Sequence, residues 1–403
     1  MMSSAMNRLY PPLSGFTVVD LTRVLSGPYC TMQLADMGAR VLKVEQPGTG
    51  DDTRAWGPPF LHGESSYFLS INRNKESLTL DLKHPEGRAI LERLLETADV
   101  LVENFRPGTM ARLGLGYEAV STRWPRLVYC SISGFGQTGP RTAEAGYDAV
   151  MQAEGGLMSI TGAGDGPPFR LGVAISDIVT GMFAAHGITL ALLARGRTGS
   201  GQLVDIGMLD ATAALLTYQA GIYFSTGTTP PRMGNRHPTI VPYETLPASD
   251  GEFVVAVGND DQWRRFCDVI GAPELTAHER FATNRARVSN YDELRPRLVE
   301  CLRAKTRDEW VRALKGAGVP CGAVREVSEV LQDEQLRARD MVQDVEHAVA
   351  GAIRVLGVPI KLSGTPGAVR TAPPALGQHT DAILRELGKS EEEIARLRLA
   401  RAV

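Results

Sequence analysis

Short runs of β-branched and apolar residues alternate with amphipathic helical patterns over residues 16–135, and this alternation constrains the fold more than any other feature of the sequence. We expect strands at 16–21, 39–45, 77–82, 99–104 and 126–132, a helix over 28–37 that opens on Pro28, and a helix over 85–98. Strands separated by crossover helices are typical of a mainly parallel sheet that is covered on both faces. The sequence therefore predicts an α/β fold, whose ligands would bind beyond the carboxyl ends of the strands.

The length of 403 residues exceeds the size at which a single hydrophobic core stops growing, which predicts two domains. Prolines and turn formers at 226–238 mark a boundary, after which 241–258 predicts a hairpin and 260–270, 290–304 and 306–317 predict helices. We assign 1–228 to a large domain and 229–330 to a smaller α+β domain. Residues 331–403 hold two strand-like segments, a proline-rich stretch and two short helices. Ser390 and Glu393 form a capping box for the last helix.

Asp177 is the only formally charged side chain between Val173 and Ala194, a segment of apolar and small residues that is followed, from Met208, by a second long helix. Burying an ionised carboxyl group costs several kcal/mol unless hydrogen bonds or a partner offset it. Three explanations are open: Ser176 and Asp177 cap a buried helix, Asp177 serves chemistry, or the segment spans a membrane. The polar residues within the segment favour a helix of a soluble core over a membrane span.

Composition and motifs exclude several classes of protein. The net charge of −3 argues against a nucleic-acid surface, and the first 15 residues contain no apolar region typical of a secretory signal. Five cysteines without a CxxC pair are typical of reduced thiols, so we expect a cytoplasmic protein. There is no HExxH and no Cys/His spacing for a metal, no GxGxxG and no P-loop. We expect neither a metal site nor a dinucleotide.

Cationic side chains are frequent in the loops of the N-terminal half, and several follow predicted strands. Together they favour an anionic ligand: Arg23, Arg54, Arg73, Lys75, Lys83, Arg106 and Arg112.

Eight segments in matching order resemble the class III CoA-transferase family, which includes formyl-CoA:oxalate and carnitine CoA-transferases. They are DLTRVLSGP, GARVLKVEQPGTGDDTR, NRNKESLTLDLK, LVENFRPGTM, GFGQTGP, GYDAVMQAEGGLMS, GVAISDIVTG and LGQHT. GDDTRAWGPPF, AGYDAV and IVPYETL are similar to the succinyl-CoA:glutarate (hydroxymethylglutarate) branch, and the tetraglycine loop of the formyl-CoA branch is absent. The resemblance implies a Rossmann-like large domain built from both chain ends, so that 331–403 returns to it, and a ring-shaped subunit of an interlocked homodimer.

The resemblance also implies site residues. The catalytic aspartate of the family falls on Asp177, whose carboxylate would attack a thioester and end as an aspartyl-CoA thioester. Two basic positions of the family are replaced by Gln46 and Ala145, and Arg23 and Arg73 are candidates to supply the missing contacts to CoA. The positions that match CoA contacts of the family are Leu80, Leu82, Lys83, Asn104, Phe105 and Arg112.

Tyr147 falls where the related 2-methylacyl-CoA racemases carry a histidine that abstracts the α-proton. Because tyrosine is a poor base at neutral pH, this position favours transfer over racemisation. The distal carboxylate of a dicarboxylic acid requires a cation, for which Arg54 and Arg170 are candidates, with His237 as a hydrogen-bonding residue.

We therefore expect an enzyme that moves CoA from an acyl-CoA donor, with succinyl-CoA as the first choice, to a free dicarboxylic acid. The CoA thioester would be a substrate rather than a resident cofactor, and we expect no nucleic-acid or membrane partner. A racemase or epimerase on the same fold and a CoA-binding protein without catalysis remain alternatives. The sequence does not name the acceptor, because one methylene or hydroxyl changes specificity through the shape of the pocket.

Overall fold

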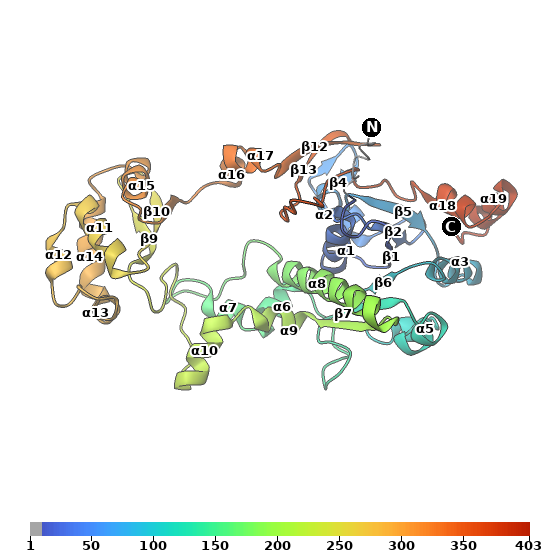
Figure 1. Ribbon diagram of the computed structural model, residues 1–403, viewed down its shortest axis with the longest axis horizontal. Helices are drawn as coiled ribbons and strands as arrows, with labels where there is room; N and C mark the ends of the chain where they lie inside the picture. The colour runs from blue at the N-terminus through green and yellow to red at the C-terminus, as the bar shows by residue number, and fades with distance from the viewer. Residues whose placement is uncertain (1–9) are drawn as a thin grey trace, which may run out of the picture. The chain divides into compact units, whose positions relative to one another are not determined.

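The computed structural model describes residues 10–403, which form two compact units (Figure 1). The large unit comprises the described residues up to Leu157 together with Leu171–Tyr218 and Glu334–Val403. The smaller unit comprises Met158–Arg170 and Gln219–Asp333. The chain divides near the boundaries predicted at 228 and 330, and the smaller unit also takes in a short segment from the first half of the sequence.

The large unit is built on a six-stranded parallel sheet in the order β5-β2-β1-β6-β7-β8. This order is that of a doubly wound Rossmann-like sheet, so the predicted α/β class with a mainly parallel sheet is confirmed. The order reverses between β1 and β6, which is where ligands of such sheets bind. The strands are β1 (Thr17–Asp20), β2 (Arg40–Glu45), β5 (Lys75–Thr79), β6 (Val100–Glu103), β7 (Val128–Ser133) and β8 (Leu203–Gly207).

Successive strand residues point to opposite faces of the sheet, and both faces are apolar. Val18 belongs to the core under α1 (Ser26–Asp36) and α8 (Ile175–Thr198), whereas Val19 belongs to the core on the other face. The helices that cover the second face are α3 (Pro85–Leu95), α5 (Tyr117–Arg123), α18 (Thr380–Glu386) and α19 (Glu391–Leu399). Helices from both ends of the chain therefore complete one core.

The C-terminal segment is attached to the sheet edge by specific hydrogen bonds. The backbone N–H of His379 donates to the carbonyl oxygen of Ser77 at 2.9 Å, and the side chain of Asn74 accepts from the N–H of Thr371 at 2.9 Å. The predicted capping box of Ser390 and Glu393 opens α19. The remaining elements of the large unit are η1 (Asp52–Ala55), β3 (Phe60–Leu61), β4 (Glu64–Ser65), α2 (Ser66–Ile71), α4 (Thr109–Arg112), α6 (Asp148–Glu154), α9 (Met208–Ala214), α17 (Glu334–Ala338), β12 (Val342–His347) and β13 (Gly351–Leu356).

The smaller unit has its own core around a three-stranded antiparallel sheet in the order β11-β10-β9. The predicted hairpin is formed by β9 (Tyr243–Pro247) and β10 (Glu252–Ala256). Trp263 and Trp310 are almost fully buried in this core. The other elements are β11 (Cys321–Ala323), α11 (Asp260–Ile270), α12 (Glu274–Ala277), α13 (Asn284–Ser289), α14 (Tyr291–Leu302), α15 (Arg307–Gly316) and α16 (Val327–Leu331), and α7 (Leu157–Ile160) and α10 (Thr217–Thr226) each contain residues of both units.

Three local predictions were wrong, and one of the open explanations for Asp177 fails. Helix α1 begins at Ser26 rather than Pro28, and β5 lies at Lys75–Thr79 rather than 77–82. The long helix expected from Met208 is broken into α9 and α10, because the backbone at Thr217 has a φ of 37°. Helix α8 begins one residue before Ser176 and has no side-chain cap, so the capping explanation for Ser176 and Asp177 fails.

Helix α8 is long and apolar enough to cross a bilayer by length and composition, and it is the one such helix among residues 10–403. Its inner face packs against α1 and the sheet. A single helix of this kind is weak evidence for a membrane protein, since core helices have the same composition.

Candidate active site

A cavity of about 160 Å³ opens at the point of the large unit where the strand order reverses. We call it the Asp177 cavity. Its lining comes from the segments that follow β1, β6 and β7, from the loop that precedes α6, and from the first turn of α8. The lining residues are Arg23, Val24, Ser26, Asp52, Asn104, Phe105, Arg106, Pro107, Ile132, Ser133, Gly134, Glu144, Ala145, Gly146, Tyr147, Asp177 and Met208.

The carboxyl group of Asp177 is held in the first turn of α8 and is only partly exposed. Burial and, second, the nearby charge of Asp148 together raise its pKa from 3.8 to about 7. The hydroxyl and the backbone N–H of Ser26 act in the opposite direction and favour the charged form. Asp177 therefore changes its charge near neutral pH, which is where a carboxylate nucleophile or a proton carrier operates.

The contact between Asp177 and Ser26 requires the starts of α1 and α8 to lie very close together. Gly181 lies one turn after Asp177, and a Cβ atom at Gly181 would meet the carbonyl oxygen of Ser26 at 2.5 Å. Because only glycine leaves room for that carbonyl group, Gly181 sets the separation of the two helices. The N-terminus of α1, with the backbone N–H of Ser26, consequently lies near the carboxylate, an arrangement that favours negative charge.

Asp148 lies at the start of α6 and links this helix to α8. Its Oδ1 accepts from the backbone N–H of Ser176 at 2.9 Å, and its Oδ2 accepts from Nε2 of Gln152 at 2.7 Å. Asp148 thus holds the N-terminus of α8 while its charge opposes ionisation of Asp177.

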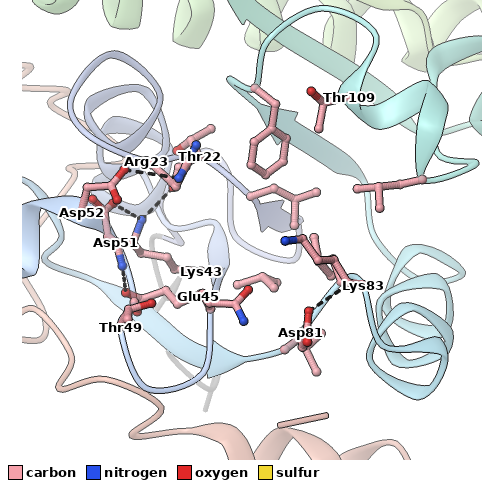
Figure 2. A pocket seen from close by; sticks show the side chains of 18 residues that line it. Thr22, Arg23, Lys43, Glu45, Thr49, Asp51, Asp52, Asp81, Lys83 and Thr109 are labelled. Carbon is pink, nitrogen blue, oxygen red and sulfur yellow. Dashed lines mark hydrogen bonds and ion pairs between the residues drawn. The ribbon is translucent and has the colours of Figure 1, made fainter. Parts of the chain in front are cut away.

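A second cavity of about 340 Å³ lies beside the first, and we call it the Lys83 cavity (Figure 2). Arg23, Asp52 and Phe105 line both cavities, so the two are adjacent. Figure 2 shows Lys43 and Arg23 directed to Asp51 and Asp52, with Lys83 across the cavity from them. Its remaining lining includes Leu21, Val44, Gln46, Leu80, Asp81, Leu82, Thr109 and Leu113.

The structure brings together most of the residues predicted to contact CoA. Leu80, Leu82, Lys83 and Phe105 line the Lys83 cavity, and Arg23 and Phe105 connect it to the Asp177 cavity. Asn104 and Tyr147 line the Asp177 cavity, with 65% of Tyr147 exposed to solvent. The two positions that lack the basic residues of the family, Gln46 and Ala145, line the Lys83 and the Asp177 cavity respectively.

Four predicted cations of the large unit line neither cavity. Lys75 is buried, and its Nζ donates to the carbonyl oxygen of Pro28 at 2.9 Å and to Asn72 at 2.8 Å. Arg73 is buried and forms a bidentate pair with Asp36 at 2.6 and 3.0 Å. Arg54 forms a bidentate pair with Glu45 at 2.7 and 2.8 Å, with its guanidinium group 3.6 Å from the ring centre of Phe68. Arg112 is hydrogen-bonded to Thr109. Ion pairing inside the fold accounts for Arg54 and Arg73 without a ligand.

Arg170 and His237 belong to the smaller unit and are described there alone. The ring of His237 stacks on that of Tyr243 with 5.2 Å between centroids, and burial lowers the pKa of His237. No group of three or more metal-ligating side chains occurs within residues 10–403.

The sequence did not single out several residues that form the Asp177 cavity. Ser26 and Asp148 act directly on Asp177. The hydroxyl group of Ser133 is buried in the lining and has no hydrogen-bond partner among the described residues. Gly134 and Gly146 pack backbone to backbone, since a Cβ at Gly146 would meet the Cα of Gly134 at 2.6 Å. These glycines belong to the sequence motifs SGFG and AGYD. A glycine in each of two loops is the one sequence feature that could have predicted the close packing of their backbones.

The model of the family described as CoA-transferase family III matches residues 13–380. A succinate–glutarate CoA-transferase from Agrobacterium fabrum is 45% identical over 384 residues, which cover 94% of this chain and 96% of the relative. An acetyl-CoA:oxalate CoA-transferase from Acetobacter aceti is 44% identical over 354 residues, which cover 88% of this chain and 90% of the relative.

Among solved structures, a CaiB/BaiF family protein from Brucella suis matches with a TM-score of 0.84 and 43% identity, over 94% of this chain and 100% of that chain. Both the sequence and the fold are thus matched over nearly the whole length, and the family predicted from eight motifs is confirmed. This chain belongs to CoA-transferase family III and is an enzyme of that class.

Proposed function

We propose that this enzyme transfers CoA from succinyl-CoA to a free dicarboxylic acid, with glutarate as the first choice of acceptor, and that Asp177 carries the transfer covalently. The observation that supports the proposal most is the Asp177 carboxyl group itself. It lines a cavity adjacent to a second cavity with the residues predicted for CoA, and its pKa is raised to about 7. The Agrobacterium relative named for succinate and glutarate, at 45% identity, supports the choice of substrates.

The first half of the reaction consumes the donor. The Asp177 carboxylate attacks the thioester carbonyl carbon, the C–S bond breaks, and a mixed anhydride and CoA thiolate form. The thiolate then attacks the aspartyl carbonyl carbon of the anhydride. Succinate leaves as the carboxylate, and an aspartyl-CoA thioester remains on Asp177.

The second half repeats these steps in reverse with the acceptor. The acceptor carboxylate attacks the aspartyl-CoA carbonyl carbon and releases CoA thiolate, which then attacks the acceptor carbonyl of the new anhydride. Acyl-CoA leaves and the Asp177 carboxylate is restored. One thioester is exchanged for another, so no further source of energy is required.

The residues around Asp177 suit this sequence. A carboxyl group with a pKa of about 7 is about half ionised at neutral pH and more basic than an ordinary aspartate. Val24, Phe105, Ile132 and Met208 give the cavity an apolar lining that limits hydrolysis of the anhydride. The unpartnered hydroxyl of Ser133 is available to donate to the carbonyl oxygen of the substrate.

CoA would bind with its nucleotide in the Lys83 cavity, where Leu80 and Leu82 offer apolar contact and Lys83 offers a cation. Arg23 would hold phosphate or pantetheine oxygens between the two cavities, since its pair with Asp52 is half exposed and exchangeable. Arg106 lines the Asp177 cavity and is a candidate for the role left by Ala145. Arg170 and His237 remain our candidates for the distal carboxylate of the acceptor.

A trapping experiment tests the covalent route. The enzyme is incubated with succinyl-CoA and hydroxylamine, digested, and analysed by mass spectrometry for a hydroxamate on the peptide that contains Asp177. We expect an adduct that depends on succinyl-CoA, that is absent from Asp177→Asn, and that persists in Asp52→Asn, a matched change in the same cavity. Exchange of α-hydrogen for solvent deuterium without any adduct would instead support a racemase, and binding without either reaction would support a non-catalytic protein.

The acceptor is tested by competition. Glutarate, oxalate and other dicarboxylic acids are offered together to the enzyme and succinyl-CoA, and the acyl-CoA products are separated by chromatography. Preferential formation of glutaryl-CoA is expected. Preferential use of oxalate, the acceptor named for the Acetobacter relative, would overturn the choice of glutarate and leave the aspartyl route intact.

We also propose that the enzyme is a homodimer, as the family resemblance implies. Helix α8 exposes a row of large apolar side chains, Met182, Phe183, Leu190 and Leu193, each between 40 and 63% exposed. A surface of this kind is more often covered by protein than left in water. Sedimentation velocity should show a dimer in the absence of detergent, and a monomer that sediments unchanged over a wide concentration range would refute this.

A further inference from the structure

The segment that connects β1 to α1 has an unusual set of hydrogen bonds. We call residues 22–26, Thr-Arg-Val-Leu-Ser, the strap. The N–H of Thr22 donates to Asp20 at 2.9 Å, and the carbonyl oxygen of Thr22 accepts from the buried Nζ of Lys43 at 2.9 Å. The backbone of the strap is thus bound by side chains from its first residue.

The next two residues continue the pattern. The side chain of Asn104 accepts from the N–H of Arg23 at 2.9 Å and donates to the carbonyl oxygen of Arg23 at 2.8 Å. Oδ1 of Asp51 accepts from the N–H of Val24 at 3.2 Å. Five consecutive backbone groups of an irregular segment are therefore bonded to side chains from β1, β2, the loop after β2 and the end of β6.

These hydrogen bonds hold Val24 in a strained backbone conformation. Its φ is 69°, in the left-handed region where a β-branched residue is a genuine outlier. Such a conformation persists only when contacts with the surrounding structure stabilise it, and strained residues of this kind are found preferentially at functional sites. Val24 lines the Asp177 cavity, and the strap ends at Ser26, which lines the same cavity and lies close to the first turn of α8, next to Asp177. The hydroxyl and N–H of Ser26 lower the pKa of Asp177.

Asp51 is itself rigidly held, so it can act as an anchor. It is almost fully buried, and its Oδ2 is 2.8 Å from Nζ of Lys43 (Figure 2). The N–H and hydroxyl of Thr53 donate to its other oxygen at 3.0 and 2.8 Å. Its position is therefore set by the fold rather than by a ligand.

We propose that Asn104 and Asp51 are positioning residues for the transfer reaction: they hold the strap in its strained conformation, so that Ser26 stays in contact with the carboxylate of Asp177. The inference rests on the proposed role of Asp177. Both amide atoms of Asn104 are engaged by the backbone of Arg23, so Asn104 acts on the strap rather than directly on CoA. The strap lies at the reversal of strand order between β1 and β6, where loops from the two strands meet.

The test uses Asn104→Ala in the full-length enzyme and measures hydroxylamine-trapped adduct on Asp177 in a single turnover. At saturating succinyl-CoA and pH 7 the limiting rate should fall by roughly tenfold, as expected for loss of a hydrogen bond to a charged group. The half-saturating concentration should change by less than about twofold. If the half-saturating concentration rises while the limiting rate is unchanged, Asn104 is a CoA contact and the proposal is overturned.

A pH profile separates positioning from general structural damage. If Ser26 moves away from Asp177, its polar groups no longer lower the pKa of that carboxyl group. The low-pH limb of the trapping rate should then move to higher pH. The other charged or titratable groups near this carboxyl group are Asp148 and Tyr67, and Arg23, Asp52, Arg106, Glu144 and Tyr147 line the same cavity. All of them remain in Asn104→Ala, so an unmoved acid limb would overturn the proposal.

Asn74→Ala is a matched control in the same unit. Its side chain also braces a loop, since it donates to Asp36 and to the carbonyl oxygen of Ala368 and accepts from the N–H groups of Arg370 and Thr371. Asn74 lines neither the Asp177 nor the Lys83 cavity. We expect lower thermal stability, an unchanged trapping rate and an unchanged pH profile. The same displaced profile in this variant would show loss of rigidity in general and overturn the proposal.

Val24→Gly provides a rescue. Glycine adopts a positive φ without the side-chain penalty of valine. In the double variant Asn104→Ala/Val24→Gly the strap should therefore adopt its native conformation more often than in Asn104→Ala alone. The double variant should therefore form the trapped adduct faster than Asn104→Ala does. If the two substitutions acted independently, the rate of the double variant would be the product of their separate effects on the rate. A double variant slower than Asn104→Ala would overturn the proposal. Absence of any adduct in the unmodified enzyme would instead refute the aspartyl route itself.

Discussion

Neutralising Asp148 should make Asp177 react at lower pH. In Asp148→Asn the side-chain oxygen that accepts from Ser176 N–H is retained, and the negative charge that opposes ionisation of Asp177 is lost. We therefore expect the pKa of Asp177 to fall and the acid limb of adduct formation to move to lower pH. The start of α8 should stay in place because its hydrogen bond to residue 148 survives.

The size of the shift is bounded by the structure. The pKa of Asp177 is raised from 3.8 to about 7, which corresponds to about 4 kcal/mol at 1.36 kcal/mol per unit. Burial is the larger cause and Asp148 the next, so removal of the charge should recover a part of this elevation, for which we take about 1.5 units as the upper scale. At pH 5.5 the ionised fraction, and with it the trapping rate, should rise by up to about 15-fold. At pH 8 the rate should change little, because Asp177 is already ionised.

The assay is the single-turnover trapping of the Asp177 adduct with succinyl-CoA between pH 5 and 8.5. Asp52→Asn is the control: Asp52 lines the same cavity and undergoes the same chemical change, but it does not contribute to the pKa shift of Asp177. An acid limb that coincides in Asp148→Asn and the unmodified enzyme would refute the electrostatic argument. An equal shift in Asp52→Asn would show that the effect belongs to the net charge of the cavity.

Three further perturbations test the packing and the electrostatics of the large unit. Gly181→Ala should lower the free energy of unfolding by about 1–3 kcal/mol, because the added methyl group would meet the carbonyl oxygen of Ser26. The control is Gly196→Ala on the same helix, where the methyl group meets nothing within 4 Å and should not destabilise the protein. Equal changes in melting temperature for the two variants would contradict this. Burial raises the pKa of Glu103 from 4.5 to about 7, so the folded state binds its proton more tightly and stability falls as pH rises through this window. Urea titrations would measure the free energy of unfolding of Glu103→Gln minus that of the unmodified enzyme. This difference should be about 3 kcal/mol more favourable to the variant at pH 8 than at pH 4.5, and a difference independent of pH would refute the assignment. Ser390→Ala should cost about 1 kcal/mol through loss of the α19 capping box and leave the trapping rate unchanged, and a lower trapping rate would contradict a purely structural role.

The alternation of strand and helix patterns was sufficient to predict the α/β class, because it reflects burial on both faces of a parallel sheet. It was not sufficient to place the start of α1. That start depends on the strap, which is held by Asn104, a residue that directly follows β6 and is 81 residues from Arg23 in sequence. The break between α9 and α10 had no local signal either, since the residues around Thr217 include neither glycine nor proline.

Asp177 could be found from the sequence because a carboxyl group in a long apolar segment is costly and therefore rare. The residues that act on it could not be found this way. Asp148 is the first residue of α6, a position where an aspartate is ordinary, and Ser26 is the first residue of α1, where a serine is equally ordinary. Arg54 and Arg73 show the converse: their cationic charge suggested a ligand, and in the fold they are paired with carboxylates on other elements. Pairing across elements is a property of the folded chain.

The two substitutions at Gln46 and Ala145 bear on how this enzyme holds CoA. Each lines one of the two cavities, so the missing charges lie on the path that we propose for the ligand rather than elsewhere on the surface. Among the cations left there, Arg23 faces Asp52 at 3.3 Å and Lys43 is buried against Asp51, whereas Lys83 and Arg106 are exposed in the lining. Exposed cations hold phosphate weakly and are screened by salt. We therefore expect the precise placement of the reacting groups to depend less on the nucleotide than on the strap, on Ser26 and on the short distance between α1 and α8 that Gly181 allows.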